Sequence, residues 1–312
     1  MIAVVFPGQG SQKPGMGRSL VENFAEADAV FTRVSDSVEV EMRVLCFESD
    51  EDTLRQTQNA QLALYTCGVA AWHVLSARVP TLAPIFAGHS VGEYAALAAA
   101  GVLSVEDGAW LVRRRGDLMA RAGNLRSGTM AAVLGLEREA LERVCEEASM
   151  RGEVAVLAND NCPGQLVISG DVSAVARAGD YATAAGAKRV LPLNVSGAFH
   201  SPLMADSASA MGEALREVEF RAGAAVVANV TAAPVTDPAL WPGLLERQLK
   251  SPVLWTDSMV GLRAAGMDLL VECGGGEVLC GLAKRIDREI RSTSVQDAES
   301  LAATVAMLEG TV

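Results

Sequence analysis

The sequence predicts an α/β fold with a largely parallel central sheet, because short apolar runs alternate with helical patterns. The β-branched run Ile2–Phe6 ends at a Pro-Gly pair, and a second apolar run over residues 84–87 ends at a glycine-rich turn that leads into strong helix formers. Residues 269–272, followed by three glycines, repeat this order near the C-terminus. The first two runs are apolar throughout apart from Pro84, which indicates strands that are buried on both faces of a sheet.

The middle of the chain has a different order of elements. Strand and helix patterns succeed one another there as βαββαβ, which is the ferredoxin-like split arrangement. We therefore predict a small ferredoxin-like subdomain over residues 127–196, inserted in a large α/β subdomain made of residues 1–126 and 197–312. The predicted elements are a strand over residues 130–134, a helix over 137–148, strands over 154–158 and 165–169, a helix over 172–185 and a strand over 189–193.

The composition excludes several classes of function. The 312 residues include 26 Lys+Arg and 38 Asp+Glu, a net charge of −12, which has the wrong sign for neutralising nucleic-acid phosphates. No apolar run approaches the roughly 18 residues of a membrane span, and the N-terminus lacks the basic lead of a signal peptide. We therefore expect a cytoplasmic protein without nucleic-acid or membrane partners. The six scattered cysteines form no C-x-x-C pair, so we expect free thiols and no metal site.

A candidate nucleophile follows the second predicted strand. Residues 88–92 read Gly-His-Ser-Val-Gly, the G-x-S-x-G pattern in which a serine occupies a strained turn between a strand and a helix. The glycines let the turn close, and the N-terminus of the helix predicted over residues 93–100 offers unpaired N–H groups to a developing oxyanion. Ser90 is therefore the predicted nucleophile, and the alternative is a glycine-rich turn with a surface serine.

A serine hydroxyl needs a base to take its proton, and the chain has three histidines. His73 lies in an apolar helical stretch and is expected to be structural. His89 adjoins the serine, but neighbouring side chains on a tight turn point apart. Elimination leaves His200, in a loop after the last strand of the predicted insert, as the base. The alternative is a histidine that packs at the junction of the subdomains.

An arginine occupies the apolar face of a predicted helix. Ser104 and Asp107 resemble a capping box that starts this helix, which runs to about residue 122. At about 100° per residue, Arg115 falls at the centre of an apolar stripe, whereas Arg113 and Arg114 rotate away from it. The stripe consists of Leu111, Val112, Leu118, Met119 and Ala122.

A guanidinium that faces an apolar interior needs an anion, which is either an internal carboxylate or a group of the substrate. The fork of an arginine suits a carboxylate. Together, Ser90, His200 and Arg115 indicate acyl transfer from a substrate with a free carboxylate. Plain hydrolysis of a neutral ester would not need the arginine.

Six stretches of the sequence match one family. They are residues 6–12 (Phe-Pro-Gly-Gln-Gly-Ser-Gln), residues 88–94, Arg115-Gly116 with Met119, residues 163–165, residues 198–201, and Gln248-Leu249 with residues 252–255. Through these stretches the chain resembles the malonyl-CoA:acyl-carrier-protein transacylase family over essentially its whole length. The resemblance implies an α/β-hydrolase-like large subdomain that carries a ferredoxin-like small one, with the active site in the cleft between them.

The resemblance implies a role for individual residues. Ser90 would be the acylated nucleophile, His200 its base, and Arg115 the residue that holds the malonyl carboxylate. The backbone N–H groups of Gln9 and Val91 would form the oxyanion hole.

The resemblance also implies that a backbone carbonyl, at the position of Gln248, orients the histidine. Spacing alone leaves four aspartates open for this role, namely Asp107, Asp117, Asp160 and Asp171. Gln61 and Met119 match positions near the substrate. Phe199 stands where a serine accompanies methylmalonyl selection in related domains, and Val91 where a glutamine does. The bulk of Phe199 would crowd an α-methyl branch, an effect of about 1–3 kcal/mol, so we expect malonyl selection.

The implied reaction is a ping-pong transfer of malonyl from malonyl-CoA to the phosphopantetheine thiol of acyl carrier protein, without a metal or cofactor. Carrier proteins are acidic, as this chain is, so docking would use a local basic patch. The candidates are Lys188 with Arg189, and Lys284 with Arg285. We favour an acceptor in fatty-acid synthesis. The alternatives are a polyketide or malonate decarboxylase system, a serine thioesterase or hydrolase, and a docking module with a dead site.

Overall fold

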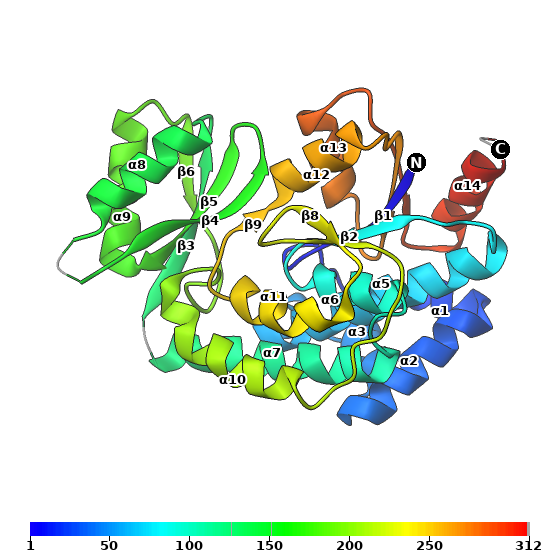
Figure 1. Cartoon of the computed structure of the whole chain (residues 1–312). Coiled ribbons are helices and arrows are strands. Elements are labelled where there is room, and N and C mark those ends of the chain that lie inside the picture. The colour runs from blue at the N-terminus through cyan, green and yellow to red at the C-terminus, as the bar shows by residue number, and fades with distance from the viewer. Residues whose placement is uncertain (126, 151, 311–312) are drawn as a thin grey trace.

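Two mixed β-sheets organise the computed structural model, which describes residues 1–125, 127–150 and 152–310 (Figure 1). In the larger sheet, five neighbouring strands run parallel and an edge strand is antiparallel to its neighbour. The predicted α/β fold is therefore confirmed. In order across this sheet, the strands are β11 (Arg291–Val295), β10 (Leu269–Cys273), β1 (Ile2–Phe6), β2 (Ile85–Gly88), β7 (Val226–Ala228) and β8 (Ala233–Val235).

Strand β1 lies between β10 and β2, and both of its faces are covered. Val4 and Phe6 belong to one apolar cluster, and Ala3 and Val5 to another on the opposite face. A parallel strand that is covered on both sides needs an apolar residue at every position. The prediction of a strand buried on both faces is confirmed.

Helices cover the two faces of the larger sheet unequally (Figure 1). Helices α12 (Trp255–Ala264) and α13 (Val278–Ile286) pack on the Ala3 side. The Val4 side carries α5 (Thr57–Arg78), which is buried over most of its length, with α6 (Gly92–Ala99) and α7 (Val105–Leu125) beside it. The other helices of this layer are α1 (Arg18–Asn23), α2 (Ala25–Val38), α3 (Met42–Phe47), α4 (Glu51–Arg55), α10 (Ala205–Leu215), α11 (Trp241–Gln248) and α14 (Ala298–Glu309), with the short 3₁₀ turns η1 (Pro202–Met204) and η2 (Pro238–Leu240).

The smaller sheet is mostly antiparallel, and it contains the elements predicted for the middle of the chain in their predicted order. Helices α8 (Arg138–Ala148) and α9 (Val172–Ala184) pack together against it and share a separate apolar cluster. Residue 126, where the first predicted domain segment ends, lies outside the described residues. In order across the sheet, the strands are β6 (Arg189–Pro192), β3 (Gly128–Leu134), β5 (Gln165–Asp171), β4 (Ala155–Cys162) and β9 (Val253–Leu254).

Two features of the smaller sheet differ from the prediction. Strand β9 comes from a distant part of the chain and pairs parallel with β4, at Asn159 and Asp160. Strand β4 was predicted to end at residue 158, but it continues to Cys162 through two irregularities in its pairing with β5. The polar residues after position 158 broke the apolar pattern, yet they stay in the strand because β5 and β9 supply their backbone partners.

Two expectations about the whole chain can be checked in the part that the structure describes. All six cysteines are free, as predicted, and all of them are buried. Within the described residues, none of the helices is both long enough and apolar enough to cross a membrane.

Candidate active site

Ser90 lies in the turn between β2 and α6, at the edge where the parallel strands end. Its φ angle is 53°, a left-handed conformation that is uncommon for a residue with a side chain. The turn is held by its backbone, because the N–H of Ser90 donates to Asn229 Oδ1 at 2.8 Å and Asn229 Nδ2 donates to the Gly88 carbonyl at 2.6 Å. Asn229 follows β7, the neighbouring strand. Backbone strain that is fixed in this way is typical of a functional turn.

The two glycines of the motif are required by the close approach of backbone segments. A Cβ atom on Gly88 would lie 2.0 Å from the carbonyl group of Gly92, and a Cβ atom on Gly92 would lie 2.1 Å from the Phe6 carbonyl oxygen. Neither backbone segment can give way without moving β1 or the turn. The sequence prediction that these glycines let the turn close is therefore confirmed.

His200 is the histidine that meets the serine. Its Nε2 lies 2.7 Å from Ser90 Oγ, and its Nδ1 lies 2.8 Å from the Gln248 carbonyl oxygen and 3.2 Å from that of Ser251. Because a carbonyl oxygen only accepts, Nδ1 carries the proton and Nε2 is free to accept one from the hydroxyl. Burial lowers the pKa of His200 to about 3, and the positive charge of Arg115 is the second cause of this decrease.

In the described part of the structure neither of the other two histidines bonds to the Ser90 hydroxyl, although His89 borders the same site. His89 Nε2 bonds to Asn161 Oδ1 at 2.8 Å, and His73 is a part-buried residue of α5. The four aspartates that spacing left open also bind elsewhere. Asp107 pairs with Ser104, Asp117 with Arg113, Asp160 with Thr256 and Arg138, and Asp171 accepts the Val154 N–H. The orienting group is therefore the backbone.

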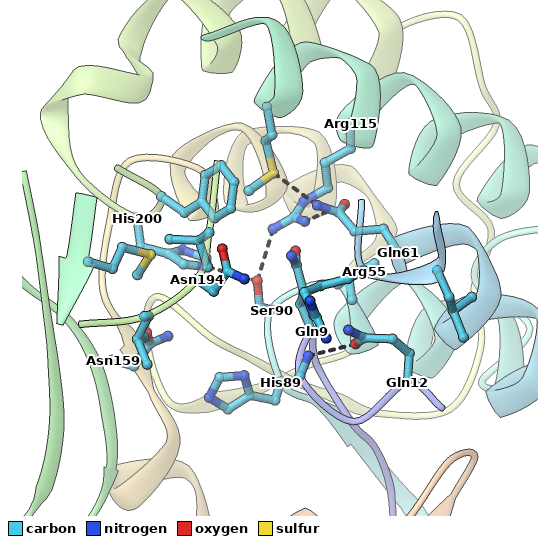
Figure 2. Close-up of a pocket in the computed structure, with 18 of the residues that line it drawn as sticks. Gln9, Gln12, Arg55, Gln61, His89, Ser90, Arg115, Asn159, Asn194 and His200 are labelled. Atoms are coloured by element: carbon cyan, nitrogen blue, oxygen red, sulfur yellow. Dashed lines mark hydrogen bonds between the residues drawn. The ribbon is translucent and has the colours of Figure 1, made fainter. Parts of the chain in front are cut away.

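Arg115 projects from α7 toward Ser90, and Figure 2 shows the two side chains joined. It is 1% exposed, and Leu111, Val112 and Met119 of the predicted stripe are buried beside it. Leu118 and Ala122, at the end of the stripe, are only part-buried. The predicted position of Arg115 on the buried face is therefore correct. The helix also begins as expected, because Ser104 Oγ accepts the Asp107 N–H at 2.9 Å.

The guanidinium is held by neutral oxygens. Arg115 Nη1 donates to Gln61 Oε1 at 2.7 Å, and Nη2 donates to Ser90 Oγ at 3.0 Å and to Gln248 Oε1 at 2.9 Å. Among the described residues, no carboxylate forms an ion pair with Arg115, and its buried Nε has no hydrogen-bond partner. A buried cation of this kind has unused capacity for an anion.

Gln61 and Gln248 are themselves fixed. Gln61 Nε2 donates to Met119 Sδ at 3.3 Å, which leaves its oxygen for Arg115. Gln248 combines its carbonyl contact to His200 with a side-chain contact to Arg115. The second of these contacts was not predicted from the sequence.

The backbone N–H groups of Gln9 and Val91 border the same space. In the described part of the chain, no hydrogen bond engages either of these N–H groups, whereas those of Ser90 and Gly92 both have acceptors. Val91 is the N-cap of α6, and Gln9 follows β1, so the two amides lie near the ends of adjacent strands. Unengaged amides beside a serine can stabilise an oxyanion.

These residues open into a cavity of about 340 Å³ that receives side chains from both sheets (Figure 2). Phe199, only 4% exposed, forms part of its wall. The sequence did not identify several other lining residues, because they lack a chemical motif. They are Leu54, Arg55, Met130, Asn159, Leu193, Asn194 and Val195.

A serine in a positive-φ turn, a histidine on its hydroxyl and free amides nearby form the arrangement of enzymes that act through an activated serine. Comparisons with known proteins also indicate an enzyme of this kind. Residues 3–298 match the family described as acyl transferase domain, and the chain belongs to that family. Malonyl CoA-acyl carrier protein transacylase of Bacillus subtilis (strain 168) is 41% identical over 310 residues, which are 99% of this chain and 97% of the relative.

Solved structures show the same similarity. An acyl carrier protein S-malonyltransferase from Vibrio cholerae has a TM-score of 0.93 at 41% identity, covering 97% of this chain and 99% of that one. A malonyl-transacylase in complex with AntF, a type II PKS acyl-carrier protein, has a TM-score of 0.93 at 38% identity, covering 98% of this chain and 99% of that one. The resemblance to the malonyl-CoA:acyl-carrier-protein transacylases is confirmed.

Proposed function

We propose that the chain is an S-malonyltransferase, which moves malonyl from malonyl-CoA to the phosphopantetheine thiol of acyl carrier protein. The observation that carries this proposal is Arg115, a buried cation held by neutral oxygens, 3.0 Å from the serine oxygen. In a malonyl group a single methylene separates the two carboxyl carbons. Once Ser90 Oγ is bonded to one of them, the free carboxylate remains within a few ångströms of Oγ, where the guanidinium lies.

The proposed mechanism has two symmetrical halves. Ser90 Oγ attacks the thioester carbon while His200 Nε2 takes its proton, and the Gln9 and Val91 amides hold the oxyanion. The carbon–sulfur bond then breaks, and CoA leaves as a thiol with the proton from His200. In the second half the carrier thiol attacks the Ser90 ester, gives its proton to His200, and the proton returns to Oγ. The transfer has no redox change, so the proposed reaction needs no cofactor.

The pocket wall supports malonyl selection. Phe199 is buried and borders the cavity, so it would crowd an α-methyl branch, as expected from the sequence. Gln61 and Met119 would hold Arg115 in place, and Arg115 would fix the acyl group for attack.

We further propose two subdomains, an α/β-hydrolase-like one over residues 1–126 and 197–312 and a ferredoxin-like one over residues 127–196. The larger subdomain then contains the whole larger sheet and contributes β9 to the edge of the smaller one. The separate apolar cluster beneath α8 and α9 supports this division. The cavity would then be the cleft between them, because Asn159 and Leu193 of the smaller subdomain line it together with Ser90 of the larger one. The six free, buried cysteines are typical of a reducing compartment and support a cytoplasmic location.

Carrier docking is proposed at one end of the smaller sheet, where the two candidate basic pairs meet. Leu134 of β3 pairs with Arg189 on one side and with Gln165 on the other, and Arg285 donates to Gln165 Oε1. Lys188 and Arg285 are both exposed. An acidic partner could therefore contact both pairs together.

The lifetime of the malonyl-enzyme tests this function. Malonyl-CoA should add one malonyl group to the native chain, detected by intact mass, and none to a Ser90→Ala variant. The ester should persist in water and disappear on addition of holo carrier protein, since the enzyme favours transfer over hydrolysis. Arg285→Glu should slow only the carrier-dependent step, whereas Arg221→Glu, a surface arginine paired with Glu219, should not. Loss of the ester in water at the same rate as with carrier would favour the thioesterase alternative.

A further inference from the structure

Glu93 is a buried carboxyl group beside the site that the proposed mechanism does not use. It lies in the first turn of α6, three residues after Ser90, and is 1% exposed. The helix around it is otherwise apolar. Burial raises its pKa to about 7. A carboxyl group is rarely kept in such a place unless its contacts are specific.

Both carboxyl oxygens of Glu93 accept hydrogen bonds from residues that contact the reacting groups of the site. Oε1 accepts a hydrogen bond from the backbone N–H of Asn229 at 2.7 Å, and Oε2 accepts one from Gln248 Nε2. Asn229 is the residue that fixes the Ser90 turn, and Gln248 is the residue that contacts both His200 and Arg115. Glu93 therefore touches the two residues that position the reacting groups.

The amide of Gln248 has two chemically different ends, and each has a definite partner. Its Nε2 donates to Glu93 Oε2 and, at 2.9 Å, to the Ser90 carbonyl, while its Oε1 accepts from Arg115 Nη2. A half turn of the amide would point its NH₂ group at the guanidinium and its oxygen at the carboxylate. Both contacts would then be repulsive. A carboxylate at position 93 thus selects the orientation that presents an oxygen to Arg115.

The same arrangement keeps the negative charge of Glu93 away from the guanidinium. A carboxylate in direct contact with Arg115 would neutralise it and occupy the donors that a substrate carboxylate needs. The Gln248 amide separates the two charges by one neutral side chain. Arg115 consequently retains its charge, and its Nε has no hydrogen-bond partner in the described part of the structure.

We infer that Glu93 is a positioning residue for dicarboxylate specificity: it orients the Gln248 amide so that an oxygen holds Arg115, and it leaves the guanidinium free for the carboxylate of the acyl group. This inference rests on the proposed function. It assigns Glu93 no contact with the substrate.

Glu93→Gln tests the inference in a Ser90→Ala background, where binding is measured without chemistry. The new amide can still offer an oxygen to the Asn229 N–H, but its NH₂ group then faces that of Gln248. The Gln248 amide should turn and present a donor to Arg115. We expect calorimetric affinity for malonyl-CoA to fall about tenfold or more, and affinity for acetyl-CoA to change by less than about twofold. Glu272→Gln, which removes another buried carboxyl that accepts a backbone N–H, should leave both affinities unchanged.

The outcomes separate this inference from the proposed function. If the Ser90→Ala parent binds malonyl-CoA and acetyl-CoA equally, the proposed function itself fails. If the parent prefers malonyl-CoA and Glu93→Gln keeps that preference, or weakens both donors equally, the inference is overturned while the function stands.

A second variant covers the case in which Glu93→Gln does not fold. Gln248→Glu puts a carboxylate oxygen directly on Arg115, and it should abolish the malonyl preference while acetyl-CoA still binds. A Gln248→Glu protein that retains the full preference would also overturn the inference.

Discussion

The imidazole of His200 lies close to the buried positive charge of Arg115. Arg115 Nη2 and His200 Nε2 both contact Ser90 Oγ, at 3.0 and 2.7 Å. Burial and the Arg115 charge lower the pKa of His200, so the imidazole remains a neutral acceptor below the range where an exposed histidine becomes protonated. A substrate carboxylate that pairs with Arg115 cancels part of this charge. The base should therefore become stronger when a dicarboxylic acyl group is bound.

This coupling predicts a difference between two pH profiles. Acetyl-CoA has no carboxylate, so Arg115 stays uncompensated and the rate of Ser90 acetylation should be flat from about pH 8 down to about pH 5. With malonyl-CoA the apparent pKa of the acylation rate should be higher, because neutralising a neighbouring positive charge favours protonated histidine. Rapid quenching and intact mass measure both rates. An inflection near the ordinary histidine pKa with acetyl-CoA, or identical profiles, would contradict the coupling.

The sequence predicts a site residue when that residue belongs to a motif or interrupts a hydrophobic pattern. It does not predict site residues whose role depends only on contacts with distant parts of the chain. Arg115 interrupts an apolar stripe, so its burial could be inferred from the helical period alone. Glu93 likewise interrupts an apolar helix, which indicates a buried acid. Its partners Asn229 and Gln248, however, lie far from it in the sequence. Side-chain contacts of that range depend on the fold and leave no local pattern.

At the scale of elements, backbone packing around the turn between β2 and α6 determines the conformation of Ser90. The N–H of His89 continues the β2 ladder by donating to the Phe6 carbonyl at 2.9 Å, and α6 begins at Gly92. The helix start therefore presses against β1, and only glycine fits at positions 88 and 92. Ser90 takes its positive φ because both ends of the turn are fixed.

A Gly88→Ala variant should lose both stability and acylation. The added Cβ would overlap the Gly92 carbonyl, so the turn must shift, at an expected cost of about 2 kcal/mol or more in the free energy of unfolding. Malonylation of Ser90 should fall with it. Gly281→Ala in α13 is the matched control, since nothing lies within 4 Å of its added Cβ. It should gain about 0.5–1 kcal/mol from helix propensity. Denaturant unfolding and intact mass measure these effects, and a Gly88→Ala protein of native stability would refute the account.

Long elements were predictable, and the shortest or least regular were not. The order βαββαβ was visible because each element carries its own hydrophobic period. Strand β9 has two residues, too few for any period, and exists because β4 offers it a free edge. The extension of β4 past residue 158 has the same origin, since pairing partners override a polar sequence.

At the scale of the whole molecule, the site is formed where the two sheets face one cavity. The strand ends of the larger sheet supply Ser90 and the neighbouring amides, and the smaller sheet supplies Asn159 and the wall near Leu193. In the proposed function, the buried guanidinium of Arg115 would distinguish a dicarboxylic acyl group from a neutral one. That cation is the basis of the proposed specificity.

The most direct test is acyl selection by an Arg115→Ala variant. Malonylation and acetylation of Ser90 are measured in parallel by intact mass, with malonyl-CoA and acetyl-CoA as donors. We expect malonylation to fall by about a hundredfold, the equivalent of a lost hydrogen-bonded charge pair, while acetylation changes little. An equal loss with both donors would contradict the assignment of Arg115 to the substrate carboxylate.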